Sequence, residues 1–161
     1  MSITIFDEHV SGPVTEQPRE RVVLPFERRQ IARQRVVLES GREIGIMLPR
    51  GTVLRGGDLL RCPSGESVAV LAAAEEVSTV RCGDPLRLAR IAYHLGNRHV
   101  ALEIGDGWVR YGRDHVLDAM VRGLGGDVEH ESAPFEPEAG AYAHGHGHSH
   151  GHRHRDHGDA H

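Results

Sequence analysis

The sequence predicts an α+β protein that begins with a small all-β domain, continues with a βαββαβ domain and ends in a disordered histidine-rich tail. Three observations predict this order. Turn-forming residues recur about every ten positions in the first half. Two amphipathic helical segments alternate with apolar runs in the second half, and eight of the 13 histidines fall after residue 143. We therefore place the domains at residues 1–73, 74–143 and 144–161.

The first half has the pattern of short strands. Four apolar runs rich in β-branched and aliphatic side chains are separated by glycine- and proline-containing turns, at residues 21–24, 34–38, 43–47 and 67–71. Around residues 72–74 the apolar side chains shrink to alanine, and two glutamates follow. We take this change as the domain boundary.

The second half begins with a candidate strand at residues 78–81 and then a helix. Asp84 provides an oxygen acceptor at the N-cap, and Pro85 occupies the first helical position. The spacing i, i+3, i+4, i+7 of an amphipathic helix is met by Leu88, Ile91, Ala92 and Leu95. Gly96 is the expected end of this helix.

A hairpin and a second helix complete this half. Residues 100–104 and 108–111 flank Gly105-Asp106-Gly107 and predict two paired strands. Asp114 caps a second helix that ends at Gly125-Gly126, and its apolar face consists of Leu117, Met120, Val121 and Leu124. Residues 127–131 predict a last strand. The order βαββαβ is the ferredoxin-like arrangement.

The composition excludes several functions. The net charge is −4, all 19 basic residues are arginine, and no lysine is present for a P-loop or a Schiff base. The sequence has no basic patch interleaved with aromatic residues, so nothing in it predicts nucleic-acid binding. Cys62 and Cys82 have no metal-site spacing, and no signal peptide or membrane-spanning run is evident. No nucleophile, base or paired-carboxylate motif indicates an enzyme, so we expect a cytoplasmic, non-catalytic protein.

The tail has the composition of a metal-collecting segment. Neutral imidazole binds nickel, copper, zinc and cobalt, and small residues between imidazoles let several rings reach one ion. The absence of large apolar residues predicts that the tail is disordered. Its interleaved Gly, Ser, Arg and Asp distinguish it from a purification tag, so we interpret it as native. The candidate ligands are His144, His146, His148, His150, His152, His154, His157 and His161.

Five histidines lie outside the tail. His99 follows the expected helix end at a helix–strand junction, and His115 follows the Asp114 cap; both are candidate metal ligands. His94 is equally compatible with packing or ligation. His9 and His130 have no partner in the sequence and are interpreted as structural.

Three strings resemble a known family. These are AYHLGNRHVALEI at residues 92–104, RYGRDHVLDAMVRGLG at 110–125 and APFEPEAGAY at 133–142. They closely resemble UreE, the urease accessory proteins that act as nickel metallochaperones. The resemblance implies a first domain like the peptide-binding part of Hsp40 chaperones and a ferredoxin-like second domain that forms a head-to-head homodimer. It also implies that His99 of each subunit binds Ni(II) at the interface. Delivery to apo-urease would involve the GTPase UreG and other accessory proteins.

The chain departs from some relatives near His115. Gly112 and Arg113 supply no imidazole there, and Arg113 would repel a cation. Two copies of His99 offer two ligands, whereas Ni(II) commonly takes about four to six. Water, His115 or the tail must supply the others, and we favour the tail. Zn(II) or Cu(II) could occupy such a site in vitro.

Two other functions remain open at this point. One is a histidine-rich nickel or zinc storage or detoxification buffer without a delivery partner. The other is a peptide-binding chaperone in which the first domain does the main work. Pull-downs with UreG and apo-urease, and deletion of residues 144–161, distinguish these from nickel delivery.

Overall fold

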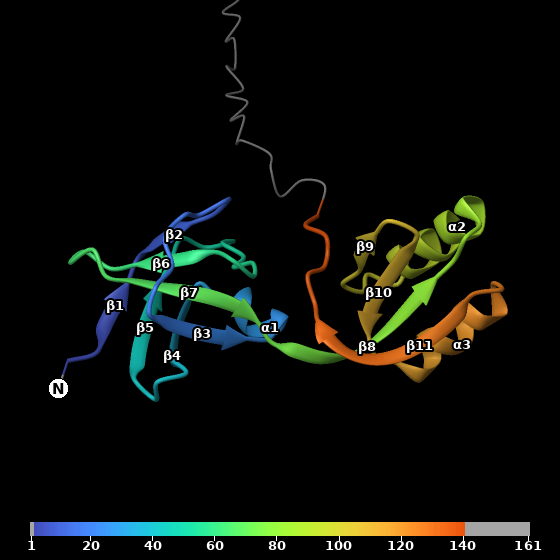
Figure 1. Ribbon diagram of the computed structural model, residues 1–161. Coiled ribbons are helices and arrows are strands. Elements are labelled where there is room, and N and C mark those ends of the chain that lie inside the picture. Colours follow the sequence, from blue (N-terminus) through green and yellow to red (C-terminus); the bar gives the residue numbers. More distant parts are fainter. Residues whose placement is uncertain (1, 141–161) are drawn as a thin grey trace, which may run out of the picture.

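The computed structural model describes residues 2–140, which form two halves (Figure 1). Each half has its own hydrophobic core. The first half consists almost wholly of strands, and the second half has the order βαββαβ. The predicted α+β fold class is confirmed for the described residues. The predicted disorder of the tail concerns residues outside them.

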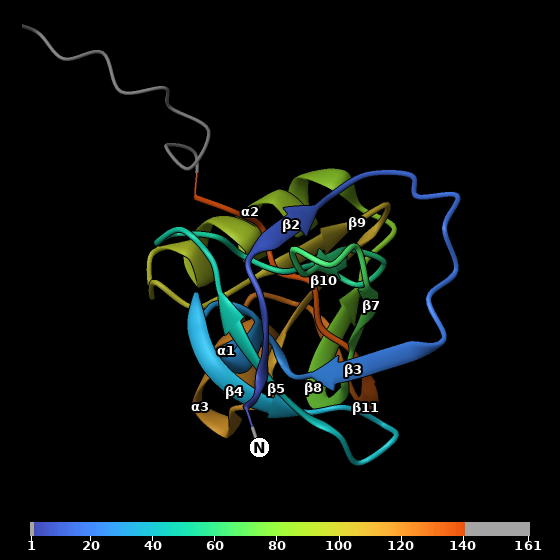
Figure 2. The ribbon, with the colours of Figure 1, turned by 90° about the vertical axis from the view of Figure 1, so that its left-hand side faces the viewer.

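The first half is built from two sheets. The strands are β1 (Thr4–Phe6), β2 (Glu8–Val10), β3 (Glu20–Leu24), β4 (Arg33–Val37), β5 (Glu43–Met47), β6 (Leu59–Arg61) and β7 (Ser67–Ala72), with one short helix α1 (Phe26–Arg29). One sheet has the order β1-β5-β4 and the other β2-β6-β7-β3. The β1–β5 and β3–β7 pairs are parallel. Side chains alternate along a strand, so that Val68 and Val70 of β7 are both buried in the core shared by the two sheets. Figure 2 shows the strands of both sheets from the side of the first half.

The second half is a four-stranded antiparallel sheet with two helices. Its elements are β8 (Ala74–Arg81), α2 (Pro85–Gly96), β9 (Glu103–Gly105), β10 (Trp108–Gly112), α3 (His115–Gly123) and β11 (Asp127–Pro134). The strand order β11-β8-β10-β9 is that of a ferredoxin-like sheet. Ile91 and Leu95 of α2 and Val121 of α3 share one core with the sheet. Both helices therefore cover the same face.

Several element boundaries differ from the sequence prediction. β8 begins at Ala74, four residues earlier than expected, because its first residues pair with the end of β11. β9 begins only at Glu103, because the chain makes a turn after α2 before it enters the sheet. The strands β1, β2 and β6 and the helix α1 had no individual prediction. Among the described residues, no helix is long and apolar enough to cross a membrane.

Candidate metal site

His99 lies in a turn that ends α2. The helix begins where the Asp84 carboxylate accepts a hydrogen bond from the Leu86 N–H at 3.1 Å. At its other end, the N–H of Arg98 donates to the Leu95 carbonyl at 3.1 Å, and the N–H of His99 donates to the Gly96 carbonyl at 3.0 Å. The tight turn therefore places an exposed imidazole directly after a helix that is anchored in the core.

The backbone of His99 adopts a left-handed conformation. Its φ is +55°, and it is the one non-glycine residue with positive φ among residues 2–140. This conformation costs a non-glycine residue about 1–2 kcal/mol. The sequence predicted that Gly96 would end the helix, and Gly96 is the last helical residue. The left-handed residue, however, is the histidine three positions later, where glycine would be the least strained choice.

His115 is the first residue of α3. Its helix is capped by Asp114, whose carboxylate accepts from the N–H groups of Val116 at 2.8 Å and Leu117 at 3.1 Å. The His115 side chain is exposed. The position of this second candidate ligand is thus fixed by the capped first turn of α3.

Neighbours of His99 and His115 line one hollow of about 350 Å³. Val100 and Ala101 directly follow His99, and Arg113 and Asp114 directly precede His115. The structure therefore brings the two chain segments together. The guanidinium of Arg113 lies 3.9 Å from a Glu76 carboxylate oxygen, which partly offsets the charge expected to repel a cation.

A buried carboxylate holds α3 on the sheet. Asp118 accepts a hydrogen bond from the Tyr111 hydroxyl at 2.7 Å, and its other oxygen lies 2.6 Å from Nε2 of His130. Burial tends to raise the pKa of Asp118, but the hydrogen bonds from Tyr111 and His130 outweigh it and leave that pKa below its usual value. Burial, together with the bond to Asp118, raises the pKa of Tyr111. His130 thus has a structural partner that its sequence neighbourhood did not reveal.

The remaining histidines of the described chain differ in their surroundings. His9 lies 2.6 Å from a carboxylate oxygen of the buried Asp58, in the first half. His94 is exposed on α2 and makes an edge contact with the Tyr93 ring, with ring centroids 5.4 Å apart. It is therefore not a core residue of α2, unlike Ile91 and Leu95.

Within residues 2–140, no three His, Cys, Asp or Glu side chains are grouped as a metal site. His99 and His115 are thus presented singly by the described part of one chain. The candidate ligands of the tail, His144, His146, His148, His150, His152, His154, His157 and His161, lie outside the described residues.

The helix that leads to His99 has a second apolar face, which the sequence analysis did not identify. Leu86 is 59% exposed and Tyr93 is 66% exposed, although both are large apolar side chains. They are seven residues apart and therefore lie on the same side of the helix. The i, i+3, i+4, i+7 pattern in the sequence indicates only the buried stripe.

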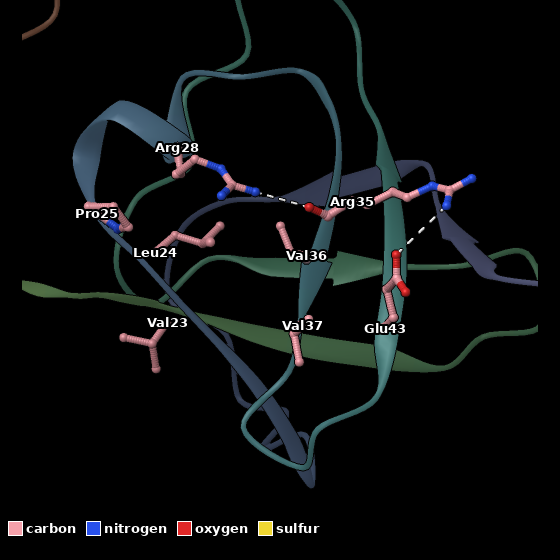
Figure 3. Close-up of a pocket in the computed structure, with 8 residues that line it drawn as sticks. All are labelled: Val23, Leu24, Pro25, Arg28, Arg35, Val36, Val37 and Glu43. Atoms are coloured by element: carbon pink, nitrogen blue, oxygen red, sulfur yellow. Dashed lines mark hydrogen bonds and ion pairs between the residues drawn. The ribbon is translucent and has the colours of Figure 1, made fainter.

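A groove lies between β3 and β4, which are edge strands of the two sheets of the first half (Figure 3). It has a volume of about 370 Å³. Arg28 closes one end by donating to the Arg35 carbonyl at 3.0 Å, and Arg35 lies 3.9 Å from Glu43. Exposed Val23 and Val37 give the groove an apolar character.

Comparison with known proteins covers nearly the whole chain. Residues 5–73 match the model of the UreE urease accessory protein N-terminal domain, and residues 75–161 match that of its C-terminal domain. A urease accessory protein UreE from Pseudomonas putida strain W619 is 62% identical over 122 residues, which are 75% of this chain and 76% of that protein. A UreE from Pseudomonas putida strain F1 is 55% identical over 139 residues, covering 86% and 83% of the two chains. A UreE from Proteus mirabilis is 52% identical over 128 residues, or 80% of each chain. The chain belongs to the UreE family of urease accessory proteins.

Proposed function

We propose that this protein is a nickel metallochaperone that delivers Ni(II) for assembly of the urease active site. Membership of the UreE family supports a role in urease maturation. The observation that carries the metal-binding assignment is the exposed His99 in a strained, left-handed turn. Backbone strain that persists on an exposed side chain is typical of functional positions.

The metal would be bound between two copies of the chain. The exposed Leu86 and Tyr93 form an apolar face on α2, the same helix whose end presents His99. Burying this face in a twofold homodimer removes the apolar side chains from water and brings a turn from each copy toward the symmetry axis. Each nickel ion would then receive one imidazole from each subunit.

The remaining ligands come from His115 and the tail. His115 belongs to a segment that borders the same hollow as the chain after His99. Residues 144–161 carry eight further imidazoles, tethered at an effective concentration of about millimolar. We propose three steps. The tail first binds Ni(II), the paired His99 residues then hold the ion at the interface, and the ion moves to UreG when the partner complex docks.

The first half would provide the docking surface for urease-maturation partners. Its groove between β3 and β4 is flanked by two sheet edges and by the exposed Val23 and Val37. An extended partner segment can pair with such an edge while its side chains contact the valines. We assign this role to the first half and metal binding to the second.

Calorimetric titration of Ni(II) and Zn(II) tests the metal site directly. The proteins to compare are the full chain, His99→Ala, His115→Ala and a chain lacking residues 144–161. We expect His99→Ala to lose the tight site, and the tail deletion to lose capacity and to weaken that site without abolishing it. A tight site that survives in His99→Ala contradicts the assignment.

Urease activation in cells distinguishes delivery from storage. Nickel delivery predicts that His99→Ala lowers urease activity at limiting nickel and that excess nickel restores it. If the tail deletion abolishes all nickel binding but urease activation is unchanged, the protein is a storage buffer instead.

A further inference from the structure

Arg29 is buried between the two halves of the protein. It is 1% exposed and is the largest fully buried side chain in the described structure. Its Nε donates to the Leu24 carbonyl at 3.1 Å, and one terminal nitrogen donates to the Leu54 carbonyl at 3.3 Å. The same guanidinium also donates to the Phe135 carbonyl and the Glu136 carboxylate, more than 100 positions away in the sequence.

Residues 135–138 form a strap, the segment that follows β11 and passes between the two halves (Figure 1). On one side it meets the first half: the rings of Phe135 and Phe26 are in edge contact, with centroids 5.9 Å apart. On its other side the N–H of Glu136 donates to the Glu103 carboxylate at 3.0 Å, and the N–H of Glu138 donates to the Leu102 carbonyl at 2.8 Å. The strap thus contacts both halves.

The strap reaches the segment that carries His99. Leu102 is three residues after His99, so their Cα atoms are at most about 11 Å apart. Phe135 also lines the hollow bordered by Val100 and Ala101. The position of the chain directly after the His99 turn therefore depends on where the strap lies.

The guanidinium chemistry explains why arginine occupies this place. Its planar fork donates to several acceptors at once, and a lysine ammonium cannot reproduce that geometry. Burial lowers the pKa of Arg29, while the carboxylates of Glu136 and Glu75 act in the opposite direction. The Glu75 carboxylate also accepts a hydrogen bond from the Phe26 N–H at 3.0 Å. A second carboxylate of the second half therefore contacts α1.

We propose that Arg29 is a positioning residue for the metal site: by holding the strap between the halves, it fixes Leu102 and Glu103 and thereby the orientation of the turn that presents His99. This inference rests on the proposed function of His99. It assigns to the first half a part in metal binding even though Arg29 itself contacts no metal ligand.

Glu136→Gln tests the proposal in the chain of residues 1–161. This side chain is 30% exposed, so the isosteric change removes the charge that pairs with Arg29 without opening a cavity. Glu66→Gln is the matched control, because Glu66 pairs with Arg42 entirely within the first half. Arg29→Lys is a second variant, which keeps the charge but loses the fork.

Hydrogen exchange of the metal-free proteins reports on the strap. We expect Glu136→Gln and Arg29→Lys to speed exchange in residues 98–103 and 135–138 by about tenfold or more, with β10 unchanged. Glu66→Gln should leave all of these rates unchanged. Unaltered exchange in residues 98–103, or a uniform rise throughout both halves, overturns the proposal.

Nickel titration of the same proteins supplies the functional measurement. Loss of a partner that orients a metal ligand typically weakens binding about 10–100-fold, and we expect about tenfold for Glu136→Gln. A lowered melting temperature with wild-type nickel affinity would show a purely structural role and contradict the inference. His99→Ala is titrated in parallel. A tight nickel site that survives in His99→Ala refutes the proposed function of His99. A tight site that is lost in His99→Ala but keeps its wild-type affinity in Glu136→Gln and Arg29→Lys refutes the role of Arg29.

Discussion

Replacing His99 by glycine separates the proposed metal ligand from the backbone conformation that presents it. The side chain is exposed, so its removal leaves no cavity. The backbone has φ = +55°, which glycine adopts without steric cost. His99→Gly should therefore lose the nickel site and keep, or improve, the stability of the metal-free protein.

The expected change in the free energy of unfolding of His99→Gly follows from two opposing effects. Relief of the left-handed conformation contributes about 1–2 kcal/mol. The greater freedom of glycine in the unfolded chain costs about 0.4–1 kcal/mol. The free energy of unfolding should rise by about 0.5–1 kcal/mol, and the melting temperature by about 1–4 °C for a chain of this size. His99→Ala retains the strained φ and should not be more stable than the wild type.

Thermal and urea unfolding in the presence of a chelator measures the stability difference, and calorimetry measures nickel binding. Both substitutions should abolish the tight site, but only glycine should raise stability. A glycine variant less stable than His99→Ala would refute the strain argument, and a glycine variant less stable than the wild type would show that the imidazole itself supports the turn.

Four further predictions address other parts of the molecule. Tyr93→Asp places a charge on the exposed face of α2 and should give a monomer in light scattering with unchanged circular dichroism; a persistent dimer contradicts this interface. Nickel affinity should fall steeply below about pH 6, because protonated imidazole cannot bind metal; equal affinities at about pH 7.5 and about pH 5.5 would rule out histidine ligands. Asp118→Asn should lower the free energy of unfolding near neutral pH by about 1–3 kcal/mol. The pKa of Asp118 is lowered in the folded protein. Ionised Asp118 therefore contributes fully to the free energy of unfolding above its unfolded pKa of about 3.9, and this contribution is lost as pH falls through the folded pKa. In urea unfolding, the free energy of unfolding of the variant should depend less on pH in acid, and an unchanged dependence would contradict this role of Asp118. Val37→Asp should reduce retention of UreG or apo-urease in pull-downs and leave nickel affinity unchanged, and undiminished retention would remove the groove from the docking surface.

The second half could be predicted well because its signals are local. Asp84 and Asp114 cap the two helices as expected, and their carboxylates accept hydrogen bonds from N–H groups two or three residues away. The hairpin between β9 and β10 closes around Asp106 and Gly107, which the turn residues indicated. Such contacts depend on neighbouring residues alone, so the sequence pattern contains them.

The first half was predicted only as a class, because its pairing is long-range. β1 pairs with β5 and β3 with β7, both in parallel, across about forty residues or more. A three-residue strand such as β6 has no periodicity that distinguishes it from a loop. The burial and the hydrogen bonds of Arg29 could not be predicted for the same reason, because its acceptors in the strap lie 106 and 107 positions away in the sequence.

The site was only partly accessible from the sequence. The position of His99 after the end of α2 was expected from Gly96, whereas its left-handed φ depends on how α2 ends against the core. The carboxylate partners of His9 and His130 lie 49 and 12 positions away in the sequence, so only the folded structure identifies them. Chemistry-bearing residue types can be recognised in a sequence, but their partners generally cannot.

The strap has a practical consequence for shortening the protein. A chain that stops after Gly140 keeps Phe135 and Glu136 and so preserves every acceptor that Arg29 uses. A chain that stops at the end of β11 would leave a cation in an apolar interior with its carboxylate removed. The shortest chain suitable for crystallisation or spectroscopy is therefore set by an arginine near the start of the sequence, and truncation should remove the histidine-rich segment without passing into residues 135–138.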